Sequence, residues 1–106
     1  MAVAYEWDVE EVSDADQTIE GQDFGKDDIM EHWHQTSYAD CLAFIAKNPP
    51  EENVRYEIVL VRDDDDRRSW AYMEDGKLPE YALDAYETEW GKIPKKYHAE
   101  VARAHK

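Results

Sequence analysis

Cysteine, glycine and proline are scarce in this chain of 106 residues, which has one cysteine, four glycines and four prolines. With Cys41 alone, no intramolecular disulfide can form, so a disulfide-stapled secreted scaffold is excluded and a cytoplasmic location is expected. No apolar stretch approaches the roughly 20 residues that a membrane-spanning helix needs. The N-terminus, MAVAYEWDVEEV, lacks a basic start and a long apolar segment, so no secretory signal peptide is expected.

Basic residues are also few, since the chain has 12 Lys and Arg but 26 Asp and Glu, which gives a net charge of −14. A polyanion gains nothing from counterion release on another polyanion, so direct binding to nucleic acid or to anionic membranes is disfavoured. Basic partners are favoured instead, above all proteins that themselves bind nucleic acid. The exception is residues 92–106, with five bases and one acid. A hydrophobic content of 42% supports one folded domain, residues 1–106.

Residues 3–12 alternate between apolar and acidic side chains, which predicts a strand with one face on the core and one in water. The expected core face is Val3, Tyr5, Trp7 and Val9, and the expected water face is Glu6, Asp8 and Glu10. Residues 28–34 fit a strand pairing with the first one, or alternatively a helix with Ile29, Met30 and Trp33 on one stripe. Residues 18–26 read as an irregular connection that could include a short strand, because two glycines weaken any regular element.

Residues 54–78 predict the central hairpin of the fold. Ile58 to Val61 form an apolar run typical of a strand covered on both faces. The six charges from Asp63 to Arg68 require a solvated connection. A second strand follows at residues 69–74, with Trp70 or Tyr72 expected in the core, and Asp75-Gly76 signals the turn that ends it.

Three helices are expected around these strands. Ser37 can cap the first, which Asn48-Pro49-Pro50 stops. The second runs from Pro79 to Gly91, with Tyr81, Leu83, Tyr86 and Trp90 as its apolar content. The last opens at Pro94 and carries Tyr97, Val101 and Ala104 on one side. The order β-β-α-β-β-α-α predicts an α+β fold, an antiparallel sheet of about four strands with two to three helices mainly on one face.

Several side-chain groups could bind metal. His32 and His34, two residues apart on a strand, share a face, and Asp28, Glu31 or His98 could complete a site. The alternative is an exposed strand with two polar histidines. The aspartates 63–66 attract cations but are offset by Arg67 and Arg68, and Asp14, Asp16 and Glu20 lack the glycine of a calcium loop. Cys41 lies among apolar helix positions and is expected to be a buried structural thiol.

Acidic residues are also candidates for binding a partner. Along the first strand, Glu6, Asp8 and Glu10 would stand about 6.6 Å apart, close to the pitch of successive phosphates on one nucleic-acid strand. With Glu11 and Asp63 to Asp66 they form the predicted partner-binding surface: Glu6, Asp8, Glu10, Glu11, Asp63, Asp64, Asp65 and Asp66. The alternative is that the acids only confer solubility, although a charge magnitude of about 2–8 suffices for that in a small domain.

In size and charge the chain resembles the small acidic proteins of phages and mobile elements that inhibit host defence, including DNA mimics and anti-CRISPR proteins. The acid-studded strand YEWDVEEV and the run DDDD carry this resemblance. These inhibitors share neither one fold nor one signature, so no residue role is carried over. The basic C-terminal segment KKYHAEVARAHK departs from a uniformly anionic mimic.

No catalytic motif is recognisable, so the function expected is a non-enzymatic inhibitor that occupies a basic nucleic-acid-binding groove. It would act without a cofactor, as a monomer or small homo-oligomer, in the cytoplasm of the host cell if phage-encoded. Two alternatives remain, a metal-binding or hydrolytic domain using His32 and His34, and a structural protein of an assembly.

Overall fold

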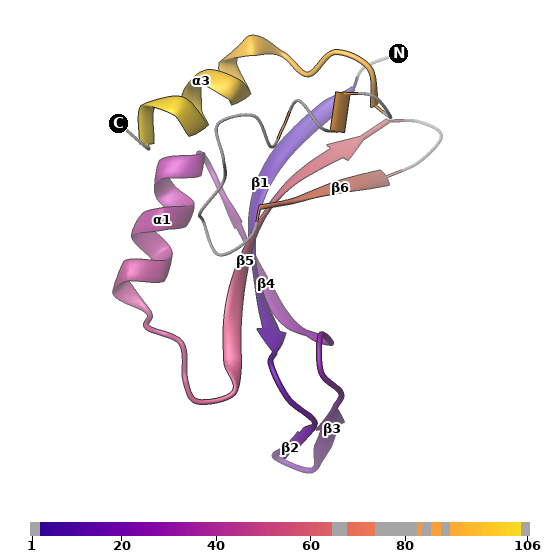
Figure 1. Ribbon diagram of the computed structural model, residues 1–106, viewed down its shortest axis with the longest axis vertical. Helices are drawn as coiled ribbons and strands as arrows, with labels where there is room; N and C mark the ends of the chain where they lie inside the picture. The colour runs from indigo at the N-terminus through magenta and orange to yellow at the C-terminus, as the bar shows by residue number, and fades with distance from the viewer. Residues whose placement is uncertain (1–2, 65–67, 74–82, 84–85, 88–89, 105–106) are drawn as a thin grey trace.

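A four-stranded antiparallel sheet with helices over one face forms the body of the molecule (Figure 1). The computed structural model describes residues 3–64, 68–73, 83, 86–87 and 90–104. The strand order is β4 (Ile29–Gln35), β1 (Ala4–Ser13), β5 (Val54–Asp63), β6 (Arg68–Met73). Two helices, α1 (Tyr38–Lys47) and α3 (Lys95–Ala104), lie on the same side of the sheet. The predicted α+β class is therefore confirmed.

The two central strands supply most of the core. β1 pairs with β5 over its whole length, so that Trp7 lies opposite Leu60 and Val9 opposite Ile58. All four residues of the apolar run 58–61 are fully buried, which confirms a strand covered on both faces. The prediction that residues 28–34 form a strand beside the first is also confirmed, with Trp33 opposite Val9.

Local sequence signals set the helix ends. The Ser37 hydroxyl accepts a hydrogen bond from the Asp40 amide at 3.1 Å, which satisfies an otherwise unpaired N–H at the start of α1. The helix ends at Asn48, before the two prolines that cannot continue it. In α3, Tyr97 and Val101 are buried one turn apart against the sheet face that carries Trp7.

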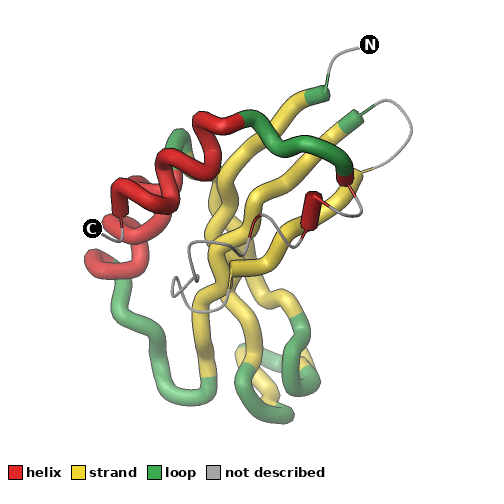
Figure 2. The backbone as a smooth tube through the Cα atoms, turned by 45° about the horizontal axis from the view of Figure 1, so that its top comes forward, coloured by secondary structure: helices red, strands yellow, loops and turns green. Residues whose placement is uncertain are grey.

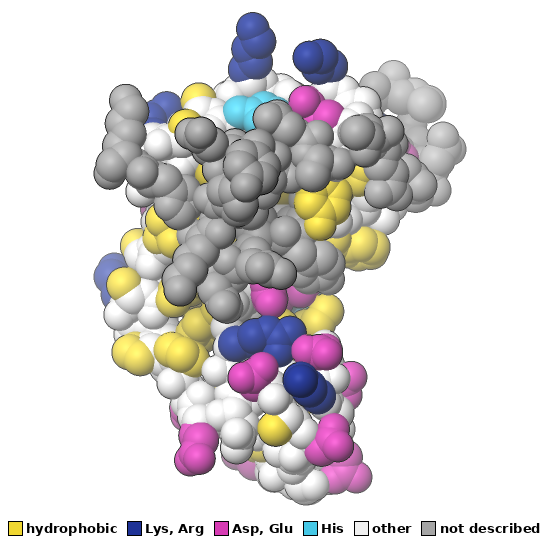
Figure 3. Space-filling model, in the orientation of Figure 1, with side chains coloured by type: hydrophobic (Ala, Val, Ile, Leu, Met, Phe, Trp, Pro, Cys, Tyr) yellow, Lys and Arg dark blue, Asp and Glu magenta, His cyan; other side chains and the backbone are white. Residues whose placement is uncertain are grey.

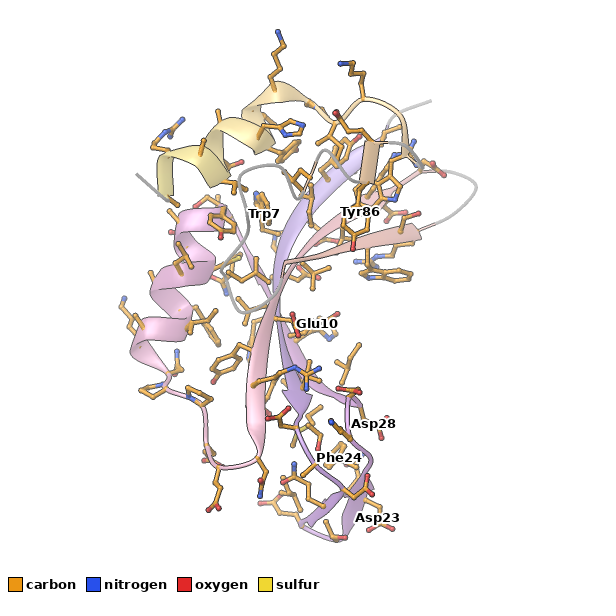
Figure 4. All side chains as sticks on the ribbon, in the orientation of Figure 1. Trp7, Glu10, Asp23, Phe24, Asp28 and Tyr86 are labelled. Atoms are coloured by element: carbon orange, nitrogen blue, oxygen red, sulfur yellow. The ribbon has the colours of Figure 1, made fainter. Side chains whose placement is uncertain are left out.

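Trp7 joins the sheet to both helices (Figure 4). Its ring centroid lies 5.2 Å from that of Tyr38 in α1 and 6.2 Å from that of Tyr97 in α3. The indole N–H of Trp7 donates to Glu100 Oε2 at 3.3 Å, and Glu100 Oε1 accepts from the Tyr38 amide at 3.1 Å. Cys41 is buried beside them, and burial, together with the nearby Asp8 carboxylate, raises the pKa of its thiol to about 12. The prediction of a buried Cys41 is confirmed.

A second, two-stranded sheet of β2 (Gln17–Ile19) and β3 (Gln22–Phe24) extends from the end of the main sheet far from α3 (Figures 1 and 2). Residues 18–26 were expected to form an irregular connection that could include a short strand, and the structure has two short strands there, joined as a hairpin. Glu20 and Gly21 both have positive φ, +51° and +82°, as the two-residue turn of a tight hairpin requires. The glycine makes the element possible, whereas the sequence pattern suggested that it would weaken it.

Two other expectations need correction or fall outside the described residues. Trp70 is 45% exposed rather than part of the core, because it lies on the edge strand β6. Most of the expected helix 79–90 lies outside the described residues, although Leu83, Tyr86, Glu87 and Trp90 are helical, and Leu83 and Trp90 are buried. In the part of the chain that the structure describes, no helix is long and apolar enough to cross a membrane.

Candidate functional site

The face of the sheet opposite the helices carries the predicted acidic row of β1. Glu6, Asp8 and Glu10 share this face as predicted, and Figure 4 shows Glu10 on the side away from α1. However, Asp8 and Glu10 are each only 6% exposed, so the prediction that they face water was wrong. β1 is a central strand, and side chains of the neighbouring strands stand on both sides of it. The row therefore cannot present evenly spaced carboxylates to a partner.

Glu6 and Asp8 also contact basic side chains within the molecule. The Nδ1 atom of His34 lies 2.9 Å from Glu6 Oε2 and 3.3 Å from Asp8 Oδ1. The other Glu6 oxygen receives a hydrogen bond from Arg68 Nη2 at 2.7 Å. A surface pocket of about 320 Å³, lined by Ala4, Tyr5, Glu6, His34 and Asp63, adjoins this group. The arrangement is a mixed cluster of acids and bases rather than an anionic stripe.

The structure changes the predicted metal set. Among the described residues, Glu6, Asp8 and His34 form the one group of three whose ligand atoms lie within 4.8 Å of one another. The residues expected to complete the site lie elsewhere. Glu31 faces the helix side of the sheet, and Asp28 accepts a hydrogen bond from the Gly25 amide. His98 Nε2 lies 3.4 Å from Glu87 Oε2. His32 is exposed, opposite Glu10 on the neighbouring strand.

The remaining predicted site residues are dispersed. Asp63 is exposed and lies opposite Arg68 in the pairing of β5 with β6. Asp64 forms an ion pair with Arg62. Asp65 and Asp66 lie outside the described residues. Glu11 lies on the helix side of the sheet, apart from Glu6, Asp8 and Glu10, because one residue along a strand reverses the face. The six predicted acids that the structure describes thus do not form one surface.

A different acidic surface stands at the far end of the molecule. We call residues 14–28, which comprise the β2–β3 hairpin and its connections to β1 and β4, the acidic tip. Six of its acids are exposed and one base, Lys26, accompanies them: Asp14, Asp16, Glu20, Asp23, Asp27 and Asp28. Figure 3 shows acidic side chains around this end and basic side chains at the opposite end, where α3 lies.

Hydrogen bonds to the backbone hold several of these carboxylates in place. Asp28 Oδ2 accepts from the Gly25 amide at 2.7 Å, and Asp16 Oδ1 accepts from the Lys26 amide at 3.0 Å. Asp23 Oδ1 accepts from the Thr18 hydroxyl across the hairpin at 2.6 Å. In Figure 4, Asp23 and Asp28 lie along the hairpin at the end of the molecule. The acids that give the tip its charge therefore also fix its turns.

Arg55 anchors the acidic tip to the main sheet. Its guanidinium contacts Asp14 at 2.9 Å, Asp27 at 2.8 Å and Glu57 at 3.0 Å. The hydrogen bond to Glu57 is the largest of the effects that raise the pKa of Arg55 above its ordinary value. Because Arg55 belongs to β5, these ion pairs hold the tip against a strand of the core.

Comparison of the chain with protein-family models, with curated proteins and with solved structures gave no match. The site is therefore interpreted from its own chemistry.

Sequence reasoning missed the acidic tip for an identifiable reason. Residues 1–31 contain 11 acids and one base. The regular alternation of acidic and apolar residues in 3–12 favoured that strand as the charged surface, whereas the acids of residues 14–28 follow no regular spacing. Gly21 was the available signal, since a tight hairpin turn needs positive φ, which glycine adopts without strain.

Proposed function

We propose that this protein is a non-enzymatic acidic inhibitor that occupies a basic nucleic-acid-binding groove on a host-defence or nucleic-acid-handling protein. The observation that carries the proposal is the acidic tip, which gathers six exposed carboxylates on the projecting β2–β3 hairpin and its connections. Two of them, Asp14 and Asp27, are paired with Arg55, and the other four form no ion pair with a described residue. This replaces β1 as the proposed source of contact charge. A narrow projecting element can enter a groove, whereas the buried acids of β1 cannot.

The charge distribution supports this orientation of binding. Exposed lysines 95 and 96 and Arg103 lie on α3, at the end of the molecule opposite to the acidic tip. A molecule with separated charge is oriented by the field of a basic groove, so that its acidic end arrives first. The basic C-terminal helix, which departs from a uniformly anionic mimic, is therefore compatible with binding through the tip.

The direct test is inhibition of DNA cleavage by purified nucleic-acid-handling enzymes, using a panel of restriction endonucleases and guide-RNA nucleases. We expect the protein to bind and inhibit at least one of them at about 50 mM salt and to release it at about 500 mM, where screening is strong. An acidic protein of matched size and charge controls for nonspecific ion exchange. If no enzyme in the panel is bound at low salt, or if the control inhibits equally, the proposal fails.

A second candidate function, divalent metal binding, rests on the cluster of Glu6, Asp8 and His34. Zinc–ligand distances of about 2.0–2.2 Å place neighbouring ligand atoms about 3.3–3.6 Å apart around a tetrahedral ion. The separation of 3.3 Å from His34 Nδ1 to Asp8 Oδ1 fits that range, whereas the 2.9 Å to Glu6 Oε2 is shorter and would have to lengthen around an ion. Arg68 opposes this function, because it already neutralises part of the charge on Glu6.

Calorimetric titration of untagged protein with zinc and manganese decides between an ion-pair cluster and a metal site. A metal site predicts stoichiometric binding that His34→Ala reduces at least about tenfold, since loss of even an outer partner costs 10- to 100-fold. The matched control is His32→Ala, which removes an exposed imidazole two residues away on the same strand. Absence of saturable binding, or equal loss in both variants, would eliminate metal binding here.

A further inference from the structure

A pocket of about 370 Å³ opens on the helix side of the sheet, between the main sheet and the connection from α1 to β5. Its polar lining includes Glu11 and Glu51, and Tyr56 forms part of its wall. The rest of its wall consists of Asn48 and four apolar residues, Ile19, Met30, Pro49 and Val54. Carboxylates beside several apolar side chains suit a guest that has both a hydrocarbon stem and a cationic head.

The negative charge at this pocket is not balanced within the described residues. Burial, then the carboxylates of Glu51 and Glu31, raise the pKa of Glu11. None of the ion pairs between described residues involves Glu11, Glu31 or Glu51, in contrast to Glu6, Asp8 and Asp14 elsewhere. Folding therefore brings the carboxylates of Glu11 and Glu51 together at one pocket. No Lys, Arg or His among the described residues forms an ion pair with either of them.

Tyr56 provides an independent indication of a ligand. Its side chain is 8% exposed and lines the pocket, and in the described part of the chain its hydroxyl has no hydrogen-bond partner. Its ring makes edge-to-face contacts with the rings of Trp33 and Phe44, at centroid distances of 6.4 Å and 6.1 Å. Glu11, Glu51 and Tyr56 line the same pocket. Burial, followed by the charges of Glu11 and Glu51, raises the pKa of the phenol. The Tyr56 hydroxyl is not one of the fully buried polar atoms, so it opens to the pocket, where it can accept a hydrogen bond from an N–H donor.

We propose that this pocket receives one arginine side chain of the basic partner protein. The inference rests on the proposed function and specifies how the partner is held next to the acidic tip. The guanidinium would donate to Glu11, Glu51 and the Tyr56 hydroxyl, while its methylene stem would contact Met30 and Val54. Arginine suits the pocket better than lysine, because its fork of N–H donors can serve several oxygens at once.

The small probe N-acetyl-arginine methylamide tests the pocket without knowledge of the partner. We expect saturable shifts of the Met30 methyl and Tyr56 ring signals in NMR titrations, and none with the uncharged citrulline analogue. Glu11→Gln with Glu51→Gln should weaken binding at least about tenfold, since each removes a charge-assisted hydrogen bond. Glu20→Asn with Asp23→Asn makes the same change of net charge at the acidic tip and should leave the arginine shifts unchanged.

Loss of binding in the double variant cannot be ascribed to unfolding. Because burial and like charges raise the pKa of Glu11, its charged form is disfavoured in the folded state, so Glu11→Gln should fold at least as stably as the parent at pH 7. Thermal unfolding of the double variant checks this. Equal shifts from the citrulline analogue, tighter binding of spermidine than of the arginine probe, or no effect of the double variant would overturn the inference.

Failure of this inference is distinguishable from failure of the proposed function. If enzyme inhibition persists unchanged in the Glu11→Gln, Glu51→Gln variant, the arginine pocket is wrong and the proposed function stands. If the arginine probe binds but no nucleic-acid-handling enzyme does, the pocket stands and its partner is of another kind.

Discussion

Conversion of four acids of the tip to amides should abolish most of the inhibition at low salt. The variant combines Asp16→Asn, Glu20→Asn, Asp23→Asn and Asp28→Asn, and it lowers the magnitude of the net charge from 14 to 10. If each exposed contact contributes about 0.5–1 kcal/mol, affinity should fall by about 30- to 1000-fold. The measurement is the inhibition constant for the bound enzyme at low and high salt. The difference from the parent should shrink as salt increases.

These substitutions are chosen to leave the fold intact. Asparagine at positions 16, 23 and 28 retains an oxygen that can accept the same hydrogen bonds from Lys26, Thr18 and Gly25. Asparagine at position 20 suits the positive φ of the turn better than glutamate does. The unfolding temperature of the variant should therefore equal or exceed that of the parent, so a loss of inhibition reports on charge.

A variant with the same charge change elsewhere separates local contacts from overall charge. Asparagine at each of positions 63–66 also removes four acids, which the sequence alone had assigned to the partner-binding surface. We expect this variant to lose less than about tenfold in affinity, because charges that make no direct contact with the partner act mainly through screened long-range attraction. An equal loss in the two variants would show that overall charge, and not the acidic tip, determines binding.

Replacement of Trp7 by alanine should cost about 3–5 kcal/mol of the free energy of unfolding, as large-to-small changes of buried aromatic residues do. Trp7 is 2% exposed and contacts both helices as well as its own sheet. Its loss would leave a cavity and remove the hydrogen bond that the indole N–H donates to Glu100. Because small domains have only about 5–15 kcal/mol of stability, the variant should be close to unfolding at 37 °C.

Trp70 is the matched control, since it is the same residue type on the same sheet but is 45% exposed. Trp70→Ala should cost less than about 1 kcal/mol, because surface substitutions usually have small effects. Urea unfolding followed by circular dichroism measures both variants without dependence on tryptophan fluorescence. Equal destabilisation would mean that Trp7 is not the residue that joins the helices to the sheet.

Local patterns were sufficient to predict most of the main sheet and its helices. The alternation of residues 3–12 assigned Trp7 and Val9 to one face of β1, and both are buried there. The apolar run from Ile58 to Val61 predicted a strand covered on both faces, because no partly exposed strand tolerates four such residues in succession. Ser37, followed by residues with helical periodicity, fixed the start of α1. The alternation in β1, the apolar run in β5 and the cap of α1 can all be predicted because each depends only on residues close to one another in the sequence.

The sequence did not reveal how the acids would be distributed in space. Asp8 and Glu10 alternate with apolar residues as exposed acids do, yet strands on both sides of β1 bury them. The encounter of Glu6 and Asp8 with His34 depends on the register between β1 and β4, which alternation alone does not specify. The same applies to Arg55, whose three acidic partners come from different segments.

The sequence by itself determined the α+β class, the central strands, the buried thiol of Cys41 and the overall charge of −14. These follow from periodicity, composition and short-range capping, all of which are local. Only the tertiary structure decided which acids reach solvent. The positive φ angles of Glu20 and Gly21 turn a glycine-containing connection into a projecting hairpin, and strand pairing covers the acids of β1. The proposed binding surface therefore moved from β1 to the acidic tip, because exposure is a property of the assembled sheet and not of one strand.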